Sequence, residues 1–354
     1  MPGIHSNSTD MPVELLKELL DESRLFAEGS LAAVQCEPVG GLYGKSHRLF
    51  RLHVQYAESG APRLPERYFL KFGMSSKEYF FYNTIARSMT SPPLPHCYHA
   101  AYEPDADQTW LLLEDLSATH FQTEWPLPPP TQLCTRTVQE LAKIHALWWQ
   151  DRRLEGEFRP AIPTGRAWVE RRALACQKLP EFIGFLSDRL SPGRQRVYER
   201  LLALPIEAWE EAKGAPQQTL LHGDMHVWNV FYPLDPQGSL YFFDWNMWDI
   251  GPPTDDLAYM MAVHWYPERR GGLERKLLEA YHDQLVEGGV TNYIWEDLHH
   301  GYRKSIFRSL LTPVWQWVRG IEAGVWWSHL ERIFLAYEDW ECGELIGDKT
   351  GRIG

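Results

Sequence analysis

The chain reads Leu221-His222-Gly223-Asp224-Met225-His226-Val227-Trp228-Asn229-Val230 and, soon afterwards, Tyr241-Phe242-Phe243-Asp244-Trp245. Three polar groups stand between apolar flanks there: the carboxylates of Asp224 and Asp244 and the amide of Asn229. Phosphoryl transfer from ATP uses these groups, because one carboxylate accepts the proton of an acceptor hydroxyl while an amide oxygen and another carboxylate hold Mg²⁺. The pattern predicts Asp224 as the catalytic base and Asn229 and Asp244 as magnesium ligands.

The apolar residues around these groups predict two strands. Val230-Phe231-Tyr232 is typical of the first strand, and Leu240 to Phe243 is typical of the second. The two strands would form a hairpin with a proposed magnesium ligand at each end. The alternative is a buried polar turn whose role is only structural.

Length and net charge limit the domain organisation and the classes of ligand that we expect. A chain of 354 residues is too long for one compact core and predicts two lobes or domains. The net charge of -12 argues against sequence-independent binding of DNA or RNA, because that binding needs cations to neutralise phosphates. The acidity weakly favours a cationic or neutral small-molecule partner, although it is also common in cytosolic proteins.

The cysteines and the hydropathy pattern predict a cytoplasmic protein. The five cysteines lie far apart, and no pair has zinc or redox-motif spacing. The N-terminus lacks a basic segment followed by an apolar core, and no apolar run approaches the roughly 18 to 20 residues that span a bilayer. We therefore expect reduced thiols and no membrane span.

A glycine-rich segment lies between two predicted strands near the N-terminus. The strands are Leu31 to Val39 and Phe50 to Tyr56, and the segment between them contains Gly40-Gly41-Leu42-Tyr43-Gly44-Lys45-Ser46. Glycines let backbone N–H groups approach phosphates closely. The segment therefore predicts a nucleotide-binding loop formed by Gly41, Gly44, Lys45 and Ser46, with an ordinary turn as the alternative.

A single lysine interrupts the next apolar strand. Lys71 lies in Arg67-Tyr68-Phe69-Leu70-Lys71-Phe72-Gly73, and Glu78 follows on a predicted helix. A lysine on such a strand can reach the α- and β-phosphates of ATP when a glutamate on the next helix holds it. The alternative is a lysine that faces solvent on an edge strand.

The C-terminal half is rich in helices and aromatic residues. Helices are predicted over Thr131 to Trp149, Trp168 to Leu190 and Arg194 to Lys213, and helical spacing of aromatic residues continues from Gly271 to the end. Most of these rings should be core. A minority could line an acceptor pocket, as a cage for a quaternary ammonium or as a stacking surface.

Together these motifs resemble the aminoglycoside phosphotransferase and choline kinase-like superfamily, including its ecdysteroid-kinase-like members. The resemblance is carried by His-Gly-Asp-x-His-x-x-Asn with the following Asp-Trp, by the lysine strand and Glu-x-x-x-Tyr helix, by Leu111 to Leu116, and by Gly251 to Asp256. Asp244-Trp245-Asn246 and Trp228 depart from many relatives, which leaves the subfamily and the substrate open.

The resemblance implies an α+β, protein-kinase-like fold with two lobes. Residues 1–113 would form a small N-terminal lobe with an antiparallel sheet, residues 114–118 the hinge, and residues 119–354 a mostly helical lobe with the catalytic loop and acceptor site. In this family the hinge pairs with adenine through backbone groups, which places Glu114, Asp115 and Leu116 at the nucleotide. Asp256 would brace the catalytic loop.

The expected activity is ATP- and Mg²⁺-dependent transfer of the γ-phosphoryl group to a hydroxyl of a small molecule. An aminoglycoside or other antibiotic, choline or ethanolamine, a lipophilic alcohol and a sugar all stay open as acceptors. A non-catalytic nucleotide-binding pseudokinase is the main alternative. A protein kinase is disfavoured, because the chain between Asp244 and Asp256 is too short for an activation loop.

Overall fold

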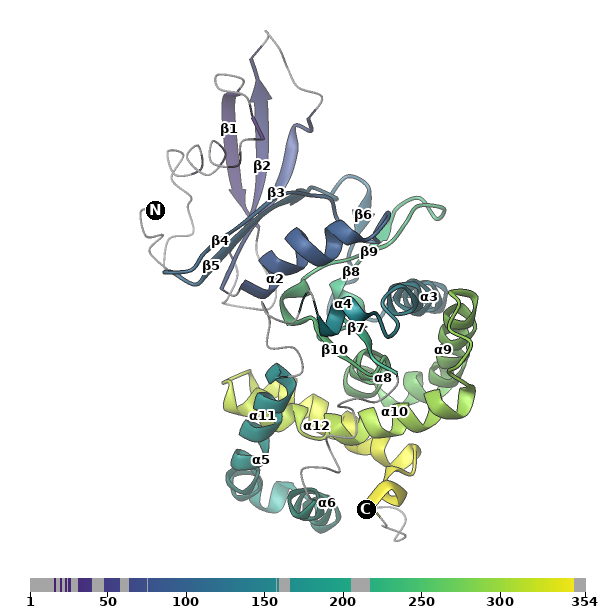
Figure 1. The fold of residues 1–354 in the computed structure, drawn as a ribbon. Helices are drawn as coiled ribbons and strands as arrows, with labels where there is room; N and C mark the ends of the chain where they lie inside the picture. Colours follow the sequence, from purple (N-terminus) through teal and green to yellow (C-terminus); the bar gives the residue numbers. More distant parts are fainter. Residues whose placement is uncertain are drawn as a thin grey trace. The chain divides into compact units, whose positions relative to one another are not determined.

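Three predicted strands, the last of which contains Lys71, pair in sequence order in the computed structural model of the chain (Figure 1). As far as the described residues go, five strands form an antiparallel sheet in the order β1-β2-β3-β5-β4. The bounds are β1 Leu31–Pro38, β2 Arg48–Tyr56, β3 Arg67–Met74, β4 Cys97–Glu103 and β5 Gln108–Glu114. β4 was not predicted, because its residues are all half-buried and show no clear alternation.

The structure describes residues 31–39, 48–57, 64–74, 76–156, 158, 166–204 and 217–346, together with Leu16, Leu20, Ser23, Leu25 and Phe26. The chain divides into two units. Unit 1 contains Met1–Gln122 and Phe231–Asn246, and unit 2 contains Thr123–Val230 and Met247–Gly354. The segment that ends at Asp244 therefore belongs with the strands around Lys71, although it follows the catalytic-loop motif in sequence.

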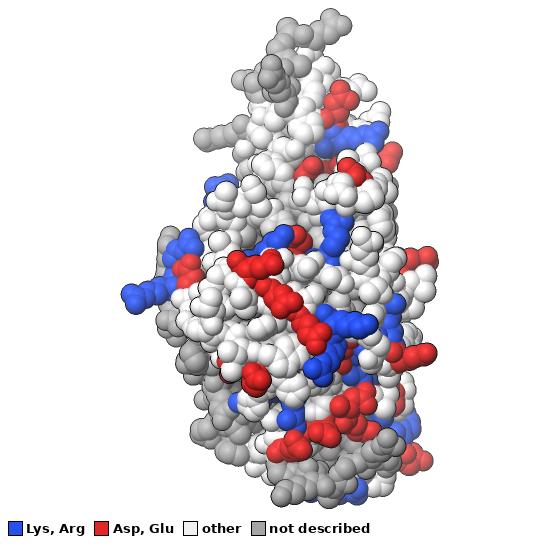
Figure 2. Space-filling model, turned by 90° about the vertical axis from the view of Figure 1, so that its right-hand side faces the viewer, with Lys and Arg blue, Asp and Glu red and all other residues white. Residues whose placement is uncertain are grey.

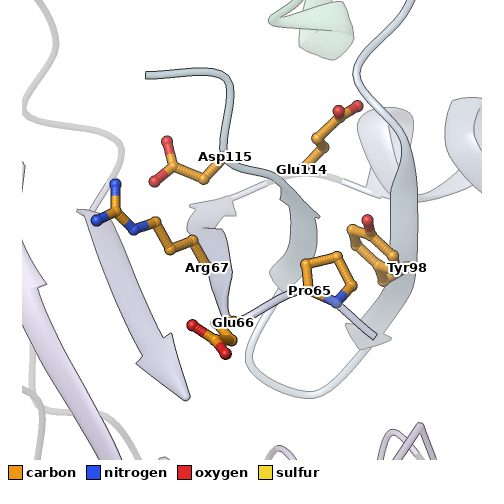
Figure 3. A pocket seen from close by; sticks show the side chains of 6 residues that line it. All are labelled: Pro65, Glu66, Arg67, Tyr98, Glu114 and Asp115. Carbon is orange, nitrogen blue, oxygen red and sulfur yellow. The ribbon is translucent and has the colours of Figure 1, made fainter. Parts of the chain in front are cut away.

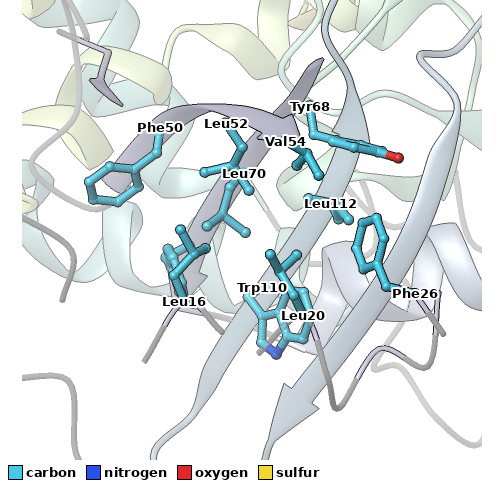
Figure 4. Packing of buried hydrophobic residues seen from close by; sticks show 11 residues of the cluster. Leu16, Leu20, Phe26, Phe50, Leu52, Val54, Tyr68, Leu70, Trp110 and Leu112 are labelled. Atoms are coloured by element: carbon cyan, nitrogen blue, oxygen red, sulfur yellow. The ribbon is translucent and has the colours of Figure 1, made fainter. Parts of the chain in front are cut away.

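The core of unit 1 lies on one face of its sheet (Figure 4). On β3, Tyr68, Leu70 and Phe72 point into this core, where they meet residues from β2, β5 and the N-terminal segment. Burial of one such side chain stabilises the fold by roughly 1.5 to 3 kcal/mol. Because side chains alternate along a strand, Lys71 points to the opposite face.

Helical turns and a small second sheet complete unit 1. After β3 come the helix α2 Ser76–Phe80, the π-helix η1 Phe81–Ile85 and the short η2 Ala86–Ser88. The predicted hairpin is confirmed: β8 Val230–Pro233 and β9 Tyr241–Phe242 are neighbours in a sheet with β6 His120–Phe121. Asn229 directly precedes this hairpin, and Asp244 closely follows it.

Helices dominate unit 2. The longer ones are α3 Thr131–Leu147, α5 Arg166–Leu186, α6 Pro192–Ala203, α9 Pro267–Glu287, α10 Trp295–Ser309, α11 Thr312–Val318 and α12 Ala323–Asp339. Shorter elements are α4 Arg152–Glu155, η3 Ser187–Arg189, β7 Thr219–Leu221, η4 Val227–Asn229, β10 Asp249–Gly251, α8 Thr254–Ala258, η6 Tyr259–Val263 and η7 Cys342–Ile346. η5 Trp245–Met247 lies where the chain returns to this unit. β7 pairs with β10, and α3 packs against α9.

One predicted helix is shorter than expected. The helix predicted over Arg194 to Lys213 ends at Ala203, and Leu204 is extended with ψ at 135°. Leu204 precedes Pro205, and the proline ring disfavours helical backbone in the residue before it. Residues 205–216 lie outside the described part of the chain.

Most of the predicted aromatic core is confirmed. Among the aromatic residues after Gly271, buried rings include Tyr281, Tyr302, Trp326 and Phe334. None of the described helices combines the length and the apolar character needed to span a bilayer. On the face shown in Figure 2, acidic and basic side chains are interspersed rather than gathered into a basic patch.

Candidate active site

Lys71 is the central group of the site in unit 1. Its Nζ lies 2.9 Å from Oε1 and 2.8 Å from Oε2 of Glu78, and 2.6 Å from Oδ1 of Asp244. Lys71 is only 6% exposed and Glu78 only 3% exposed, so the alternative of a solvent-facing lysine is wrong. Burial lowers the pKa of Lys71, but the charges of Asp244 and Glu78 outweigh it and raise that pKa, which keeps the lysine charged.

Asp244 adopts an uncommon backbone conformation. Its φ is +65°, in the left-handed region that costs most residues free energy but that aspartate and asparagine tolerate best. The next residue anchors the turn: the Trp245 ring stacks on Phe81 at 4.2 Å between centroids, and its Nε1 donates to the Phe242 carbonyl at 3.3 Å. The Asp244 side chain keeps 24% exposure.

Two of the predicted hinge residues border a pocket of about 380 Å³. Glu114 and Asp115 contribute to its lining, whereas Leu116 is buried and does not. Figure 3 shows Arg67 and Asp115 on one side of the pocket, with Pro65 and Tyr98 on the other. The buried Asp115 carboxylate also lies 3.1 Å from Nε of Arg51 on β2, and this ion pair fixes the chain end after β5.

The glycine-rich loop stays a prediction. Gly41, Gly44, Lys45 and Ser46 lie outside the residues that the structure describes. The strands on either side of them, β1 and β2, pair as expected.

The catalytic-loop motif lies in unit 2, and a buried aspartate braces it. Asp256 on α8 accepts the backbone N–H of His222 at 2.7 Å and that of Gly223 at 2.9 Å, as expected. The Nδ2 group of Asn229 donates to the carbonyl oxygen of Asp224 at 3.0 Å. These bonds fix the backbone around Asp224, whose side chain keeps 30% exposure.

Gly223 is required by the close packing of this loop. Its φ is +77°, and a Cβ at this position would lie 2.0 Å from the carbonyl oxygen of Met247. We expect Gly223→Ala to destabilise the protein by roughly 2 to 4 kcal/mol, since a left-handed alanine is strained and a backbone clash cannot relax easily. Denaturant unfolding measures the change.

Gly184 provides the matched control. It lies within α5, and a Cβ there would meet nothing within 4 Å. Gly184→Ala should therefore stabilise the protein by about 0.5 to 1 kcal/mol. Equal effects of the two substitutions would show that the loop does not depend on Gly223.

Three further side chains near Asp224 were not predicted. His226 Nε2 lies 3.7 Å from Asp224 Oδ2, and the Tyr259 hydroxyl hydrogen-bonds the same side chain. Arg171 on α5 interacts electrostatically with Asp224. The sequence held a signal for Tyr259, because it follows Asp256 by three residues and so shares its helical face, but none for Arg171.

Behind His226 lies a group of buried histidine rings. His264 donates from Nδ1 to the Tyr259 carbonyl at 2.7 Å, and its ring lies 5.1 Å from His226 and 4.5 Å from His329. Burial lowers the pKa of His264 well below its ordinary value, and His226 lowers it further. His264 is therefore neutral at pH 7.

This histidine predicts a loss of stability in acid. Its pKa is lower in the folded than in the unfolded state, so stability is complete above about pH 6.5 and decreases as the pH falls below it. We expect His264→Asn, which keeps an N–H donor, to reduce the difference in unfolding free energy between pH 7 and pH 5 by about 1 kcal/mol or more. The exposed His96→Asn is the control, and an unchanged pH dependence in His264→Asn would contradict the prediction.

Asn229 in unit 2 and Asp244 in unit 1 each carry an oxygen of the kind that binds Mg²⁺. The described side-chain hydrogen bonds of Asn229 use Nδ2, which leaves its Oδ1 oxygen able to bind a cation. Asp244 offers a partly exposed carboxylate. Mg²⁺ prefers oxygen, and it usually takes one or two protein ligands and fills its other positions with phosphate oxygens and water.

Comparison with protein-family models identifies one that matches most of the described chain. The model of the phosphotransferase enzyme family, APH, matches residues 76–292. The matched residues include Glu78, the predicted hinge, the catalytic loop and Asp244. No curated protein sequence matches the chain significantly.

Solved structures share the fold at low sequence identity. A Ralstonia eutropha protein provisionally named an aminoglycoside phosphotransferase has a TM-score of 0.60 at 16% identity, over 95% of this chain and 99% of that protein. Choline kinase from Streptococcus pneumoniae has a TM-score of 0.50 at 16% identity, over 91% and 99%. A mutant aminoglycoside phosphotransferase in ternary complex with ADP and hygromycin B has a TM-score of 0.51 at 15% identity, over 95% and 99%.

These comparisons confirm two expectations. The resemblance to the aminoglycoside phosphotransferase and choline kinase-like superfamily is confirmed by the family match and by the structural neighbours. The α+β, protein-kinase-like fold is confirmed as well. At these identities the solved structures establish the fold alone.

Proposed function

This chain belongs to the phosphotransferase enzyme family, and from that membership we propose that it transfers the γ-phosphoryl group of ATP to a hydroxyl of a small molecule. The observation that carries the proposal is Lys71, whose buried ammonium is held by Glu78 and by Asp244. A lysine fixed between two carboxylates is suited to neutralise the α- and β-phosphates of a nucleotide. The Asp244 carboxylate, which is partly exposed, would also contribute an oxygen ligand to a cation.

The nucleotide is proposed to bind through groups of unit 1. Backbone groups of Glu114, Asp115 and Leu116 pair with adenine, as the family resemblance implies. Gly41, Gly44, Lys45 and Ser46 cover the phosphates, a role that rests on the sequence alone. Asn229 and Asp244 would hold Mg²⁺, which would supply positive charge against the triphosphate.

Asp224 is proposed to act on the acceptor. As the acceptor oxygen forms its bond to the γ-phosphorus, its proton passes to the Asp224 carboxylate. The bond between that phosphorus and the β,γ-bridging oxygen breaks, and ADP leaves with the electron pair. His226 and Tyr259 contact the Asp224 side chain and hold it in position.

Two measurements on the purified chain test this proposal. ATP should raise the melting temperature only when Mg²⁺ is present, and ligand at 100 times its Kd should stabilise the folded state by about 2.7 kcal/mol. Pools of hydroxyl-bearing metabolites and antibiotics should raise the rate of ADP release above the rate of ATP hydrolysis by the enzyme alone.

The outcomes separate the alternatives. Stabilisation by Mg²⁺ and ATP without acceptor-dependent ADP release would indicate a nucleotide-binding module without catalysis. Phosphate incorporation into generic protein substrates would indicate a protein kinase. The absence of any effect of ATP would contradict the role given to Lys71.

A further inference from the structure

Arg171 packs on the ring of Trp315 in unit 2, close to the proposed catalytic loop. Arg171 comes from α5 and Trp315 from α11, two helices that pack against each other. The guanidinium carbon of Arg171 lies 5.1 Å from the centre of the Trp315 ring, and that of Arg319 lies 5.9 Å from it. Because two cations already lie over Trp315, this ring is poorly suited to bind a cationic ligand.

A chain of contacts links Arg171 to the proposed catalytic base. Its Nη2 donates to Sδ of Met247 at 3.5 Å. The carbonyl of Met247 in turn packs against Gly223, the residue that precedes Asp224. The charges of Asp224 and Asp249 also act on the Arg171 guanidinium. Arg171 therefore belongs to the surroundings of the acceptor hydroxyl and not to a remote surface.

Arg171 lacks a strong partner among the residues that the structure describes. Its described hydrogen bond goes to a thioether sulfur, which is a weak acceptor. Its side chain is half-buried, and burial lowers its pKa. Half-buried guanidinium groups normally pair with carboxylates or phosphates, which match their fork of donors. The described hydrogen bond uses one of the five N–H donors of the guanidinium, so donors remain for a ligand.

The geometry points to an acceptor that carries an anionic group beside its hydroxyl, with the anion bound by Arg171 and the hydroxyl held at Asp224. This inference rests on the proposed function and narrows its substrate class to hydroxy acids or hydroxyl-bearing phosphate esters. It reverses the weak expectation of a cationic or neutral acceptor, which came from the net charge of the whole chain. Charges close to the acceptor hydroxyl affect binding more than the net charge of the whole chain does, because solvent and salt screen distant charges.

Three matched pools of alcohols test the charge of the acceptor. One pool contains short hydroxy carboxylates and hydroxyl-bearing monophosphates, the second contains the amides or methyl esters of the same hydroxy carboxylates, and the third contains amino alcohols. ADP release with Mg²⁺ and ATP is measured for each. We expect members of the anionic pool to exceed their neutral counterparts in kcat/KM by about 10- to 100-fold, as for other charge-assisted hydrogen bonds. Testing carboxylates and monophosphates separately identifies which anion Arg171 binds.

Variants of Arg171 assign the preference to that residue. Arg171→Gln should raise KM for anionic acceptors by about 10- to 100-fold more than it raises KM for their neutral counterparts. Arg171→Lys keeps the positive charge but loses the planar fork of donors. Its KM for anionic acceptors should therefore lie between that of the unaltered chain and that of Arg171→Gln. Arg196→Gln removes an exposed arginine from α6 and serves as the control. Melting temperatures verify that all variants fold.

The results distinguish this inference from the proposed function. Preference for the neutral or the amino-alcohol pool would overturn the inference and leave the phosphotransferase intact. An equal loss of kcat for every acceptor in Arg171→Gln would also overturn it, since Arg171 would then act on the transferred phosphoryl group. Binding of ATP and Mg²⁺ without ADP release from any of these pools, or from the metabolite and antibiotic pools, would remove the proposed function itself, and the inference with it.

Discussion

Asp224→Asn is expected to lower kcat by at least ~10²-fold while the Kd for ATP changes little. Asparagine keeps the size of the side chain, but its amide cannot accept the proton of the acceptor hydroxyl. The backbone of the loop should keep its conformation, because its hydrogen bonds do not involve the substituted side chain. Asn229 donates to the Asp224 carbonyl, and Asp256 accepts the backbone N–H groups of His222 and Gly223.

The measurement is steady-state ADP release with the best acceptor pool, combined with nucleotide binding by calorimetry. Asp283→Asn is the control, since this aspartate is exposed on α9. Near-normal turnover in Asp224→Asn would refute its assignment as the base. A parallel loss of ATP affinity would instead place Asp224 in the nucleotide site.

Asp244→Asn is expected to reduce kcat/KM by at least ~10²-fold and to raise the Mg²⁺ concentration needed for half-maximal activity. The substitution removes the negative charge that the proposed metal site needs and one of the two partners of Lys71. Asparagine tolerates a φ of +65° about as well as aspartate does. Backbone strain should therefore not obscure the effect on magnesium.

A matched control exists in the same unit. Asp107 also has a positive φ, of 46°, but it lies in an exposed turn, where it accepts the hydroxyl of Tyr102. Asp107→Asn should leave activity and its Mg²⁺ dependence unchanged. An Asp244→Asn enzyme with normal activity at low Mg²⁺ would show that Asp244 is not a metal ligand.

Local sequence signals predicted the contacts of unit 1 well. A lysine within an apolar strand and a glutamate on the following helix indicated a pair, and the structure places their charged groups 2.8 Å apart. The hairpin between Asn229 and Asp244 followed from two short apolar runs. The direct contact between Lys71 and Asp244 was not predicted, because these residues are 173 positions apart and no local pattern links them.

The surroundings of Asp224 were harder to predict. Arg171 reaches it from a helix far upstream of the motif, so tertiary packing alone brings it there, whereas the position of Tyr259 three residues after Asp256 was the one local signal. The role that we propose for Arg171 would also change the expected charge of the acceptor, and the net charge of the chain gave no sign of it. The adenine-binding role of the hinge and the phosphate-binding role of the glycine-rich loop stay predictions.

Transfer of the terminal phosphate itself is the most direct test of the account. The chain is incubated with Mg²⁺, γ-labelled ATP and, in separate reactions, each pool of alcohols, metabolites and antibiotics, and the label is followed by chromatography. We predict that label passes to a phosphate ester of an acceptor, in step with ADP, and that Asp224→Asn and Asp244→Asn each abolish most of this transfer. Label that stays in ATP, or that leaves only as inorganic phosphate in every pool, would contradict the central claim.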